Sequence, residues 1–176
     1  MSYLFGYEIE FQGISEEKLD HVVEWDKSYW ESCHDGSGLE LKTRLPFSDV
    51  SDHLDRCKIL FESLKRHGAS IDIKKWGTRR TPCGTHIHIS SSEKVITNDI
   101  SKHAKALNAL RASTYACRFR YASLNVSQDK YSAIRLYKLE RAELRLEIRA
   151  YNATFNLRGI RKMFDNTIQI ADILYS

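Results

Sequence analysis

The alternation of polar and apolar residues along segment 142–151 is the feature that most constrains how this chain folds. Glu147 and Arg149 are separated there by a single apolar residue, and the pattern continues on both sides. Side chains two positions apart point to the same face of a β-strand. Segments 3–12 and 85–90 alternate in the same way. The chain is therefore predicted to form a sheet with one apolar face, covered by helices, and one polar face.

Local signals predict the remaining elements. Strands are predicted at 27–33, 39–45 and 131–136, helices at 15–25, 50–67, 98–117 and 157–174, and loops at 34–38, 74–82 and 124–130. The helix at 98–117 is predicted to have Ile100, Ala104, Leu107 and Leu110 as its apolar positions. This order of elements predicts an α+β fold, in which a mainly antiparallel sheet carries helices packed on one face.

Length and composition limit the class of protein. The chain has 176 residues and a formal net charge of +4, which favours a single compact domain spanning 1–176 and phosphate-bearing ligands. No apolar run reaches the roughly 18 residues of a membrane span, and the first ten residues lack a basic leader, so we expect a cytoplasmic protein without a membrane partner. The four cysteines form no Cys-x-x-Cys pair, so reduced thiols are expected.

Polar pairs that share a strand face recur on four predicted strands. Glu8 and Glu10 lie two positions apart, so both carboxylates point to one face about 7 Å from each other. The other members are His86 with His88, Asp35 and Glu40 on either side of the predicted turn, and Arg145, Glu147 and Arg149 on one strand. Carboxylates with an imidazole suit Mg²⁺ or Mn²⁺, and arginines offer planar forks to phosphate oxygens. Together these residues predict a metal–polyphosphate site.

Other interpretations of these residues stay open at this point. An isolated Glu-x-Glu pair is typical of a solvated sheet face. Cys83, His86 and His88 would offer the ligands of a zinc site. The basic segment 74–80 is either a flap over phosphates or a solvated loop.

Four segments, taken in order, resemble the successive motifs of the amidoligase family. They read GYEIE at 6–10, DGS at 35–37 with EL at 40–41, CGTHIHIS at 83–90 and LEIRAYNATFN at 146–156. This family is one of the carboxylate–amine ligases, which include glutamine synthetase and γ-glutamylcysteine synthetase. The resemblance runs from residue 6 to about residue 170, and it implies a glutamine synthetase-like catalytic sheet in a single amidoligase-like catalytic domain.

The resemblance also implies that this sheet binds ATP and Mg²⁺ (or Mn²⁺). The implied metal ligands are Glu8, His86 and Glu147 for one ion and Glu10 and Glu40, with Asp35 as a further candidate, for another. The implied contacts to phosphate or to the acyl-phosphate intermediate are His88, Arg135, Arg145 and Arg149.

The implied reaction joins a small-molecule or peptide carboxylate to an amine. Transfer of the γ-phosphoryl group of ATP to the carboxylate creates an acyl phosphate, which has a better leaving group than oxide. Arg145 and Arg149 would stabilise the charge that develops on the transferred group. When the amine attacks, Asp35 would accept its proton as a general base.

Two alternatives to a ligase are also considered. A non-catalytic module on the same fold would bind a nucleotide, a polyanion or a protein partner. A nucleic-acid-binding protein would use the basic segment 74–80, Trp76 and the arginines near Tyr121. The second alternative leaves the acidic pairs unexplained, because carboxylates oppose phosphate unless a metal intervenes. The ligase is therefore the leading prediction.

Overall fold

The computed structural model describes residues 3–35, 38–71, 75–76, 79–80, 83–114, 125–128, 132–138 and 144–175, and the side chains at 34, 35, 38, 75, 76, 79, 80, 137, 138 and 144 lie outside the described set. The strands are β1 (Leu4–Phe11), β2 (Trp30–Asp35), β3 (Gly38–Thr43), β4 (Lys75–Trp76), β5 (Arg79–Arg80), β6 (Gly84–Ser90), β7 (Val126–Ser127), β8 (Ile134–Lys138) and β9 (Leu144–Asn152). The helices are α1 (Glu16–Val23), the 3₁₀ turn η1 (Glu24–Asp26), α2 (Val50–Arg66), α3 (Ile100–Ala112) and α4 (Leu157–Leu174).

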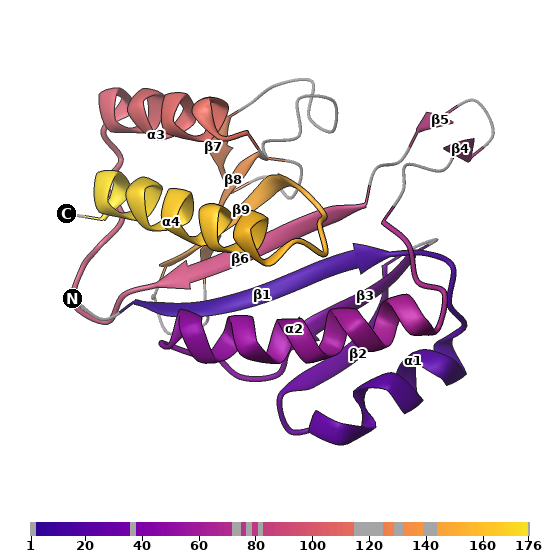
Figure 1. Cartoon of the computed structure of the whole chain (residues 1–176). Helices are drawn as coiled ribbons and strands as arrows, with labels where there is room; N and C mark the ends of the chain where they lie inside the picture. The colour runs from indigo at the N-terminus through magenta and orange to yellow at the C-terminus, as the bar shows by residue number, and fades with distance from the viewer. Residues whose placement is uncertain are drawn as a thin grey trace.

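Seven of the strands form one sheet in the order β2-β3-β1-β6-β9-β8-β7. Neighbouring strands pair antiparallel, except β7 and β8, which pair parallel. Helices α2 and α4 lie across one face of this sheet, and α3 packs on α4 (Figure 1). The α+β class and the mainly antiparallel sheet that the sequence predicts are confirmed.

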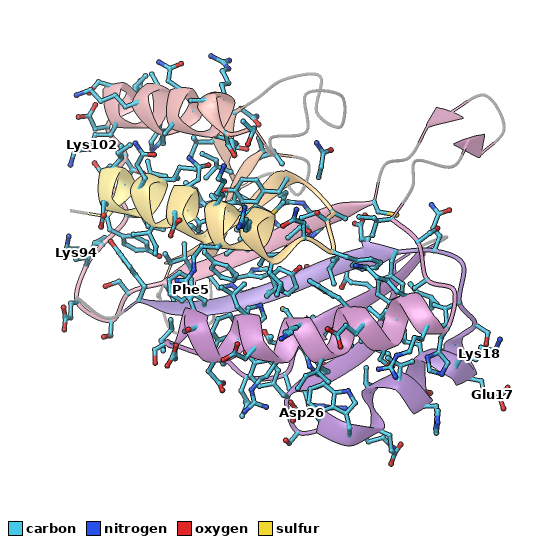
Figure 2. The ribbon with its side chains drawn as sticks, in the orientation of Figure 1. Phe5, Glu17, Lys18, Asp26, Lys94 and Lys102 are labelled. Carbon is cyan, nitrogen blue, oxygen red and sulfur yellow. The ribbon has the colours of Figure 1, made fainter. Side chains whose placement is uncertain are left out.

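Alternate residues of β1 build the apolar layer beneath the helices. Phe5, Tyr7, Ile9 and Phe11 are buried, whereas the residues between them are more exposed and point to the opposite face. The ring of Phe164 on α4 packs edge-on against Phe5 at 5.5 Å and is stacked against Tyr7 at 6.1 Å between centroids; Figure 2 shows Phe5 at this helix–sheet boundary. Burial of this apolar face therefore leaves the carboxylates of β1 on the face opposite α2 and α4.

Side-chain caps and glycines set the ends of the helices. Asp49 accepts backbone hydrogen bonds from the first turn of α2, and Asn156 does the same for α4. Gly68 ends α2 with φ +89°. Gly13 has φ +87°, and a Cβ there would lie 2.6 Å from the Gly68 carbonyl oxygen. Both the backbone conformation and this close approach require glycine at position 13.

Helix α3 differs from the prediction in its length and in the face it buries. It ends at Ala112 instead of near 117, and Ile100 is 82% exposed. Ala104 is also exposed, whereas Ala106, which was not predicted, is buried. Leu110 is buried, as predicted. The physical reason is that α3 packs mainly on α4, so its neighbour in the tertiary structure selects the buried stripe.

Two segments predicted as loops contain short strands. β7 lies within 124–130 and pairs with β8, and β4 and β5 form a small hairpin within 74–82. β8 also begins later than the predicted strand 131–136. Pairing with a neighbouring strand defines such short elements, which are too brief to carry a periodic pattern. The side chains of 74–80 lie outside the described residues. The two interpretations of this segment, a flap over phosphates and a solvated loop, therefore both stay predictions.

Cys33, Cys57 and Cys83 are free thiols, which agrees with the prediction for these three, and Cys117 lies outside the described residues. Cys57 is fully buried, and burial raises the pKa of its thiol well above the usual range. Across the described ranges, none of the helices combines the length and the apolar character needed to cross a membrane.

His53 is a buried histidine on the helix-covered side of the sheet. Its ring stacks on Phe47 at 4.3 Å, its Nδ1 lies 2.8 Å from the Tyr29 hydroxyl, and its Nε2 lies 3.3 Å from Cys57 Sγ. Burial, together with the charge of Arg56, lowers the pKa of His53 from 6.5 to about 3. The folded protein therefore holds this imidazole in its neutral form at physiological pH.

Because of His53, the stability of the fold is expected to fall as the pH drops from about 6.5 toward 3. In that range the unfolded chain binds a proton at this position and the folded chain does not, so acid favours unfolding. Between pH 7 and pH 5 this group alone should lower the free energy of unfolding by about 2 kcal/mol. Urea titrations at both pH values measure the loss, and His53→Phe should lose about 2 kcal/mol less. Equal losses of stability in the unmodified protein and in His53→Phe would contradict the role of His53 in this pH dependence.

Candidate functional site

The face of the sheet opposite α2 and α4 gathers charged side chains from its central strands. On each strand these residues alternate with the apolar positions that face the helices, so they share the opposite face. The register between strands then decides which of them meet. It places opposite one another Glu8 and His86, Glu10 and Glu40, His88 and Glu147, and Arg135 and Glu147.

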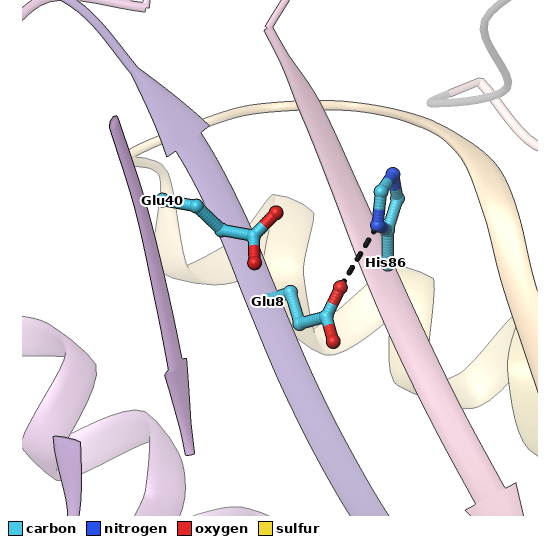
Figure 3. Close-up of side chains that lie close together, drawn as sticks. All are labelled: Glu8, Glu40 and His86. Carbon is cyan, nitrogen blue, oxygen red and sulfur yellow. Dashed lines mark hydrogen bonds and ion pairs between the residues drawn. The ribbon is translucent and has the colours of Figure 1, made fainter. Parts of the chain in front are cut away.

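Glu8 is the centre of this polar face. His86 Nδ1 donates to Glu8 Oε2 at 3.0 Å, and His88 Nε2 donates to Glu8 Oε1 at 2.8 Å; Figure 3 shows the first of these contacts beside Glu40. Burial raises the pKa of Glu8, but the hydrogen bonds from His86 and His88 outweigh it and hold that pKa well below its usual range. Glu8 is therefore an ionised carboxylate at neutral pH.

Gly6 makes room for the imidazole of His88. The two residues are partners across β1 and β6, and a Cβ at position 6 would lie only 3.3 Å from His88 Cβ and 3.5 Å from its ring. A larger residue would have to push the ring aside. Glycine at this position lets His88 lie over β1 and reach Glu8 on the same face.

Glu147 is buried between two arginines. Its side chain is 3% exposed, and it accepts a hydrogen bond from Arg149 at 3.0 Å and a longer one from Arg135 at 3.4 Å. A buried carboxylate requires such partners, since an isolated charge would neutralise instead. The predicted Arg149 and Arg135 therefore lie within reach of the same carboxylate.

Glu10 and Glu40 complete the acidic part of the face. Glu10 Oε2 accepts a hydrogen bond from the backbone N–H of Gly84 at 2.7 Å, and its Oε1 lies 3.7 Å from His86 Nε2. Glu40 accepts a hydrogen bond from the Cys33 thiol at 3.1 Å. Burial and the charge of Glu8 raise the pKa of Glu40. A cation beside Glu40 would relieve this repulsion.

Two groups of side chains in the described ranges place donor atoms within 4.8 Å of one another. The groups are Glu8, Glu40 and His86, and Glu8, His88 and Glu147. Ligand atoms this close can share one ion, because divalent cations bind oxygen at roughly 2.0 to 2.6 Å. The oxygen and imidazole donors suit Mg²⁺ or Mn²⁺. Residues that the sequence predicts as ligands therefore meet on one surface.

The membership of these groups differs from the sets that the resemblance implies. Glu40 lies with Glu8 and His86, and Glu147 lies with Glu8 and His88, which the resemblance places on phosphate. His86 Nδ1 also lies 3.7 Å from Glu147 Oε1, so the implied ligands Glu8, His86 and Glu147 are still neighbours. Glu10 belongs to neither group, and one of its oxygens is held by the backbone. Cys83 is absent from both groups, so among the described residues the zinc set does not come together. The individual roles stay predictions, whereas the proximity of Glu8, His86, His88 and Glu147 is a feature of the fold.

A cavity of about 300 Å³ opens beside Glu8 and His88. Its lining residues are Leu4, Phe5, Gly6, Tyr7, Glu8, Glu31, Lys42, Thr43, Arg44, Leu45, Pro46, His88, Ser90 and Arg145. Arg145 and His88, both of which the resemblance implies as phosphate contacts, line this one cavity. Three cationic side chains, Lys42, Arg44 and Arg145, and two carboxylates, Glu8 and Glu31, line this cavity, so cations outnumber carboxylates by one.

The sequence analysis missed Lys42. It lies opposite Glu8 across β1 and β3, lines the cavity, and forms an ion pair with Glu31 at 3.7 Å. The two-residue period of a strand would have predicted its place, because Lys42 is two positions from Glu40 and so shares its strand face. The side chains of Asp35 and Trp76 lie outside the described residues.

Neither a scan of the chain against protein-family models nor a search of the curated proteins gives a match.

Replacing Glu40 by glutamine is expected to stabilise the metal-free protein by about 1 kcal/mol. The variant removes a buried charge that Glu8 repels, while its amide oxygen can still accept from Cys33. Since the folded state raises the pKa of Glu40, ionisation opposes folding, so the gain is present near neutral pH and disappears in acid, where Glu40 is protonated in both states.

Thermal unfolding with EDTA and with Mn²⁺ measures both effects of Glu40→Gln. We expect a higher melting temperature in EDTA and a much smaller Mn²⁺-induced increase than in the unmodified protein. Glu31→Gln is the matched control, because Glu31 lies near the cavity but in neither donor group. An undiminished Mn²⁺ response in Glu40→Gln would exclude Glu40 as a ligand.

Proposed function

We propose that this protein is an ATP-dependent carboxylate–amine ligase of the amidoligase kind, which forms an amide through an acyl phosphate. The observation that carries the proposal is the pair of carboxylate–imidazole groups sharing Glu8, with arginines at one side and, at the other, a cavity lined by Lys42, Arg44 and Arg145. The order of the four amidoligase-like segments supports it independently, because these segments supply Glu8, Glu40, His86 and Glu147.

The cavity beside Glu8 is the proposed binding place for the phosphates of the nucleotide. Lys42, Arg44 and Arg145 line it, and His88 and Glu8 stand at its boundary with the donor groups. Its volume of about 300 Å³ is at the lower end for small-molecule sites. Arg44 is fixed in place by hydrogen bonds from Nε to the carbonyl oxygens of residues 27 and 30, at 2.7 and 3.1 Å.

In the proposed reaction the substrate carboxylate oxygen attacks the γ-phosphorus, the bond to the bridging oxygen breaks, and ADP leaves. The amine then attacks the acyl carbon, phosphate leaves with the carbon–oxygen bond electrons, and the amine proton passes to a base. Arg145 and Arg149 are proposed to stabilise charge on the transferred phosphoryl oxygens, and Asp35 stays the predicted base. Divalent ions held by Glu8, Glu40, His86, His88 and Glu147 would neutralise phosphate charge.

Thermal unfolding with and without ATP, Mg²⁺ or Mn²⁺ is the first test. A ligand that binds only the native state raises the melting temperature by mass action, and the proposal expects an increase that needs both nucleotide and metal. Phosphate release is then measured across panels of carboxylic acids and amines. Phosphate release that needs both a carboxylic acid and an amine supports the ligase.

The same experiments separate the ligase from its alternatives. Metal-dependent nucleotide binding without phosphate release for any acid–amine pair would favour the non-catalytic nucleotide-binding module. Oligonucleotide binding that falls steeply with salt, without a nucleotide response, would favour nucleic-acid binding. The absence of any response to ATP with metal would contradict the ligase.

A further inference from the structure

A groove of about 650 Å³ lies between the start of α2 and helix α4, on the helix-covered side of the sheet. Its apolar part includes Phe5, which Figure 2 shows between the two helices, together with Val50 and Ile168. The groove touches both Arg161 and Asp172, which lie about three turns, or about 16 Å, apart along α4. We infer that this groove receives α4 of a second copy of the chain, antiparallel to its own α4, in a two-fold symmetric dimer.

The charges of α4 are divided between its two halves. Arg158, Arg161 and Lys162 lie in its first two turns, and the carboxylates Asp165 and Asp172 follow. The dipole of a helix disfavours cations near its N-terminus, so this order is unfavourable within a single chain. In the part of the chain that the structure describes, Arg161 has no ion-pair partner. The exposed charges of α4 therefore lack compensation inside one molecule.

A two-fold axis across the groove makes these charges complementary. In an antiparallel pair the first half of one α4 lies beside the second half of the other, and every contact occurs twice. Arg161 then meets Asp172 of the partner subunit, and Asp172 meets the partner subunit's Arg161. Asp165 lies within one turn of Arg161 and Lys162 on its own helix. The cations also come to lie near the C-terminal end of the partner's helix, where its dipole favours them.

Asp172 is held in position for this contact. Its Oδ1 accepts a hydrogen bond from the Tyr3 hydroxyl at 2.6 Å, and the residue is exposed. A carboxylate has two oxygens, so it can accept from Tyr3 and from a guanidinium together. Asp49, the other carboxylate of the groove, accepts backbone hydrogen bonds from Ser51 and Asp52 and so serves as the cap of α2. Fixing Asp172 in advance reduces the side-chain entropy lost on association.

The groove and the proposed ligase site lie on opposite sides of the sheet. Helix α4 packs on the sheet through its buried residues, whereas Glu8 points to the other face. A dimer formed through α4 therefore does not cover the polar face. The inference goes beyond the proposed function and does not depend on it.

Analytical ultracentrifugation of the full chain across micromolar concentrations tests the dimer. Arg161→Glu and Asp172→Arg should each weaken it by at least about tenfold, because each brings like charges together twice. An equal mixture of the two variants should form the dimer again, since both contacts of the mixed pair join opposite charges. Lys18→Glu is the matched control: it makes the same change of charge at an exposed position on α1, and it should leave the dimer unchanged.

A chain that stays monomeric at all these concentrations would overturn the dimer. A dimer that Arg161→Glu leaves intact, or a mixture of the two variants that stays monomeric, would also overturn it. Should Asp172→Arg fail to fold without the Tyr3 hydrogen bond, the comparison of Arg161→Glu with Lys18→Glu still decides. Phosphate release is measured separately: turnover by a monomer would leave the ligase standing without the dimer, and a dimer without turnover for any acid–amine pair would do the reverse.

Discussion

Replacing Glu147 by glutamine is expected to reduce metal- and ATP-dependent phosphate release by more than about 100-fold. Glu147 shares a donor group with Glu8 and His88, and an amide oxygen is a weaker ligand for a hard cation than a carboxylate. The variant also leaves Arg149 and Arg135 without the charge that they contact in the interior. We therefore expect a further loss of about 3 kcal/mol in the free energy of unfolding.

Glu147→Asp separates these two effects. It keeps the negative charge for Arg149 but withdraws the carboxylate by one methylene, so the ligand geometry changes more than the charge balance. We expect most of the stability to return and the metal-dependent activity to stay low. Phosphate release measures the metal-dependent activity, and melting temperatures in EDTA measure the stability. Full activity in Glu147→Gln would remove Glu147 from the proposed site.

Replacing Phe164 by alanine is expected to have the largest effect on the fold, a loss of about 4 kcal/mol in the free energy of unfolding. Phe164 is fully buried. Its ring lies against Phe5 at 5.5 Å, Phe47 at 5.9 Å and His53 at 5.4 Å. Removing the ring leaves a cavity where α4 meets the sheet and α2, because these neighbours belong to different elements and relax only in part.

Urea unfolding monitored by circular dichroism measures the loss caused by Phe164→Ala. Lys162→Ala is the matched control, since Lys162 is exposed on the same helix and alanine favours helix formation. The control should stay within about 0.5 kcal/mol of the unmodified protein. A loss below about 1 kcal/mol for Phe164→Ala would mean that α4 contributes little to the helix–sheet packing.

Apolar packing and charge have separate places in this fold. The helices bury one face of β1, and the charged residues of the same strand face the other way. The Glu40 charge is costly there, because Glu8 raises its pKa. The proposed ions would offset that cost, which explains why acidic residues can be held so close together at a binding site.

Local alternation along single strands was enough to predict which side chains share a face. It placed Glu8 with Glu10 and His86 with His88, because the two-residue period of a strand depends only on the backbone. The same rule would have added Lys42, two positions from Glu40. Likewise the caps at Asp49 and Asn156 were predictable, since they act within one turn of the helix.

The sequence by itself therefore determined the α+β class, the polar face and most of the residues on it. Only the tertiary structure decided how these residues are grouped. The register between β1, β6 and β9 brings both histidines to Glu8 and sets His88 beside Glu147. The packing of α3 on α4 buries Ala106 and leaves Ile100 exposed. The physical reason is that register and helix packing depend on partners distant in the chain, whereas periodicity and capping depend on neighbours within a few residues.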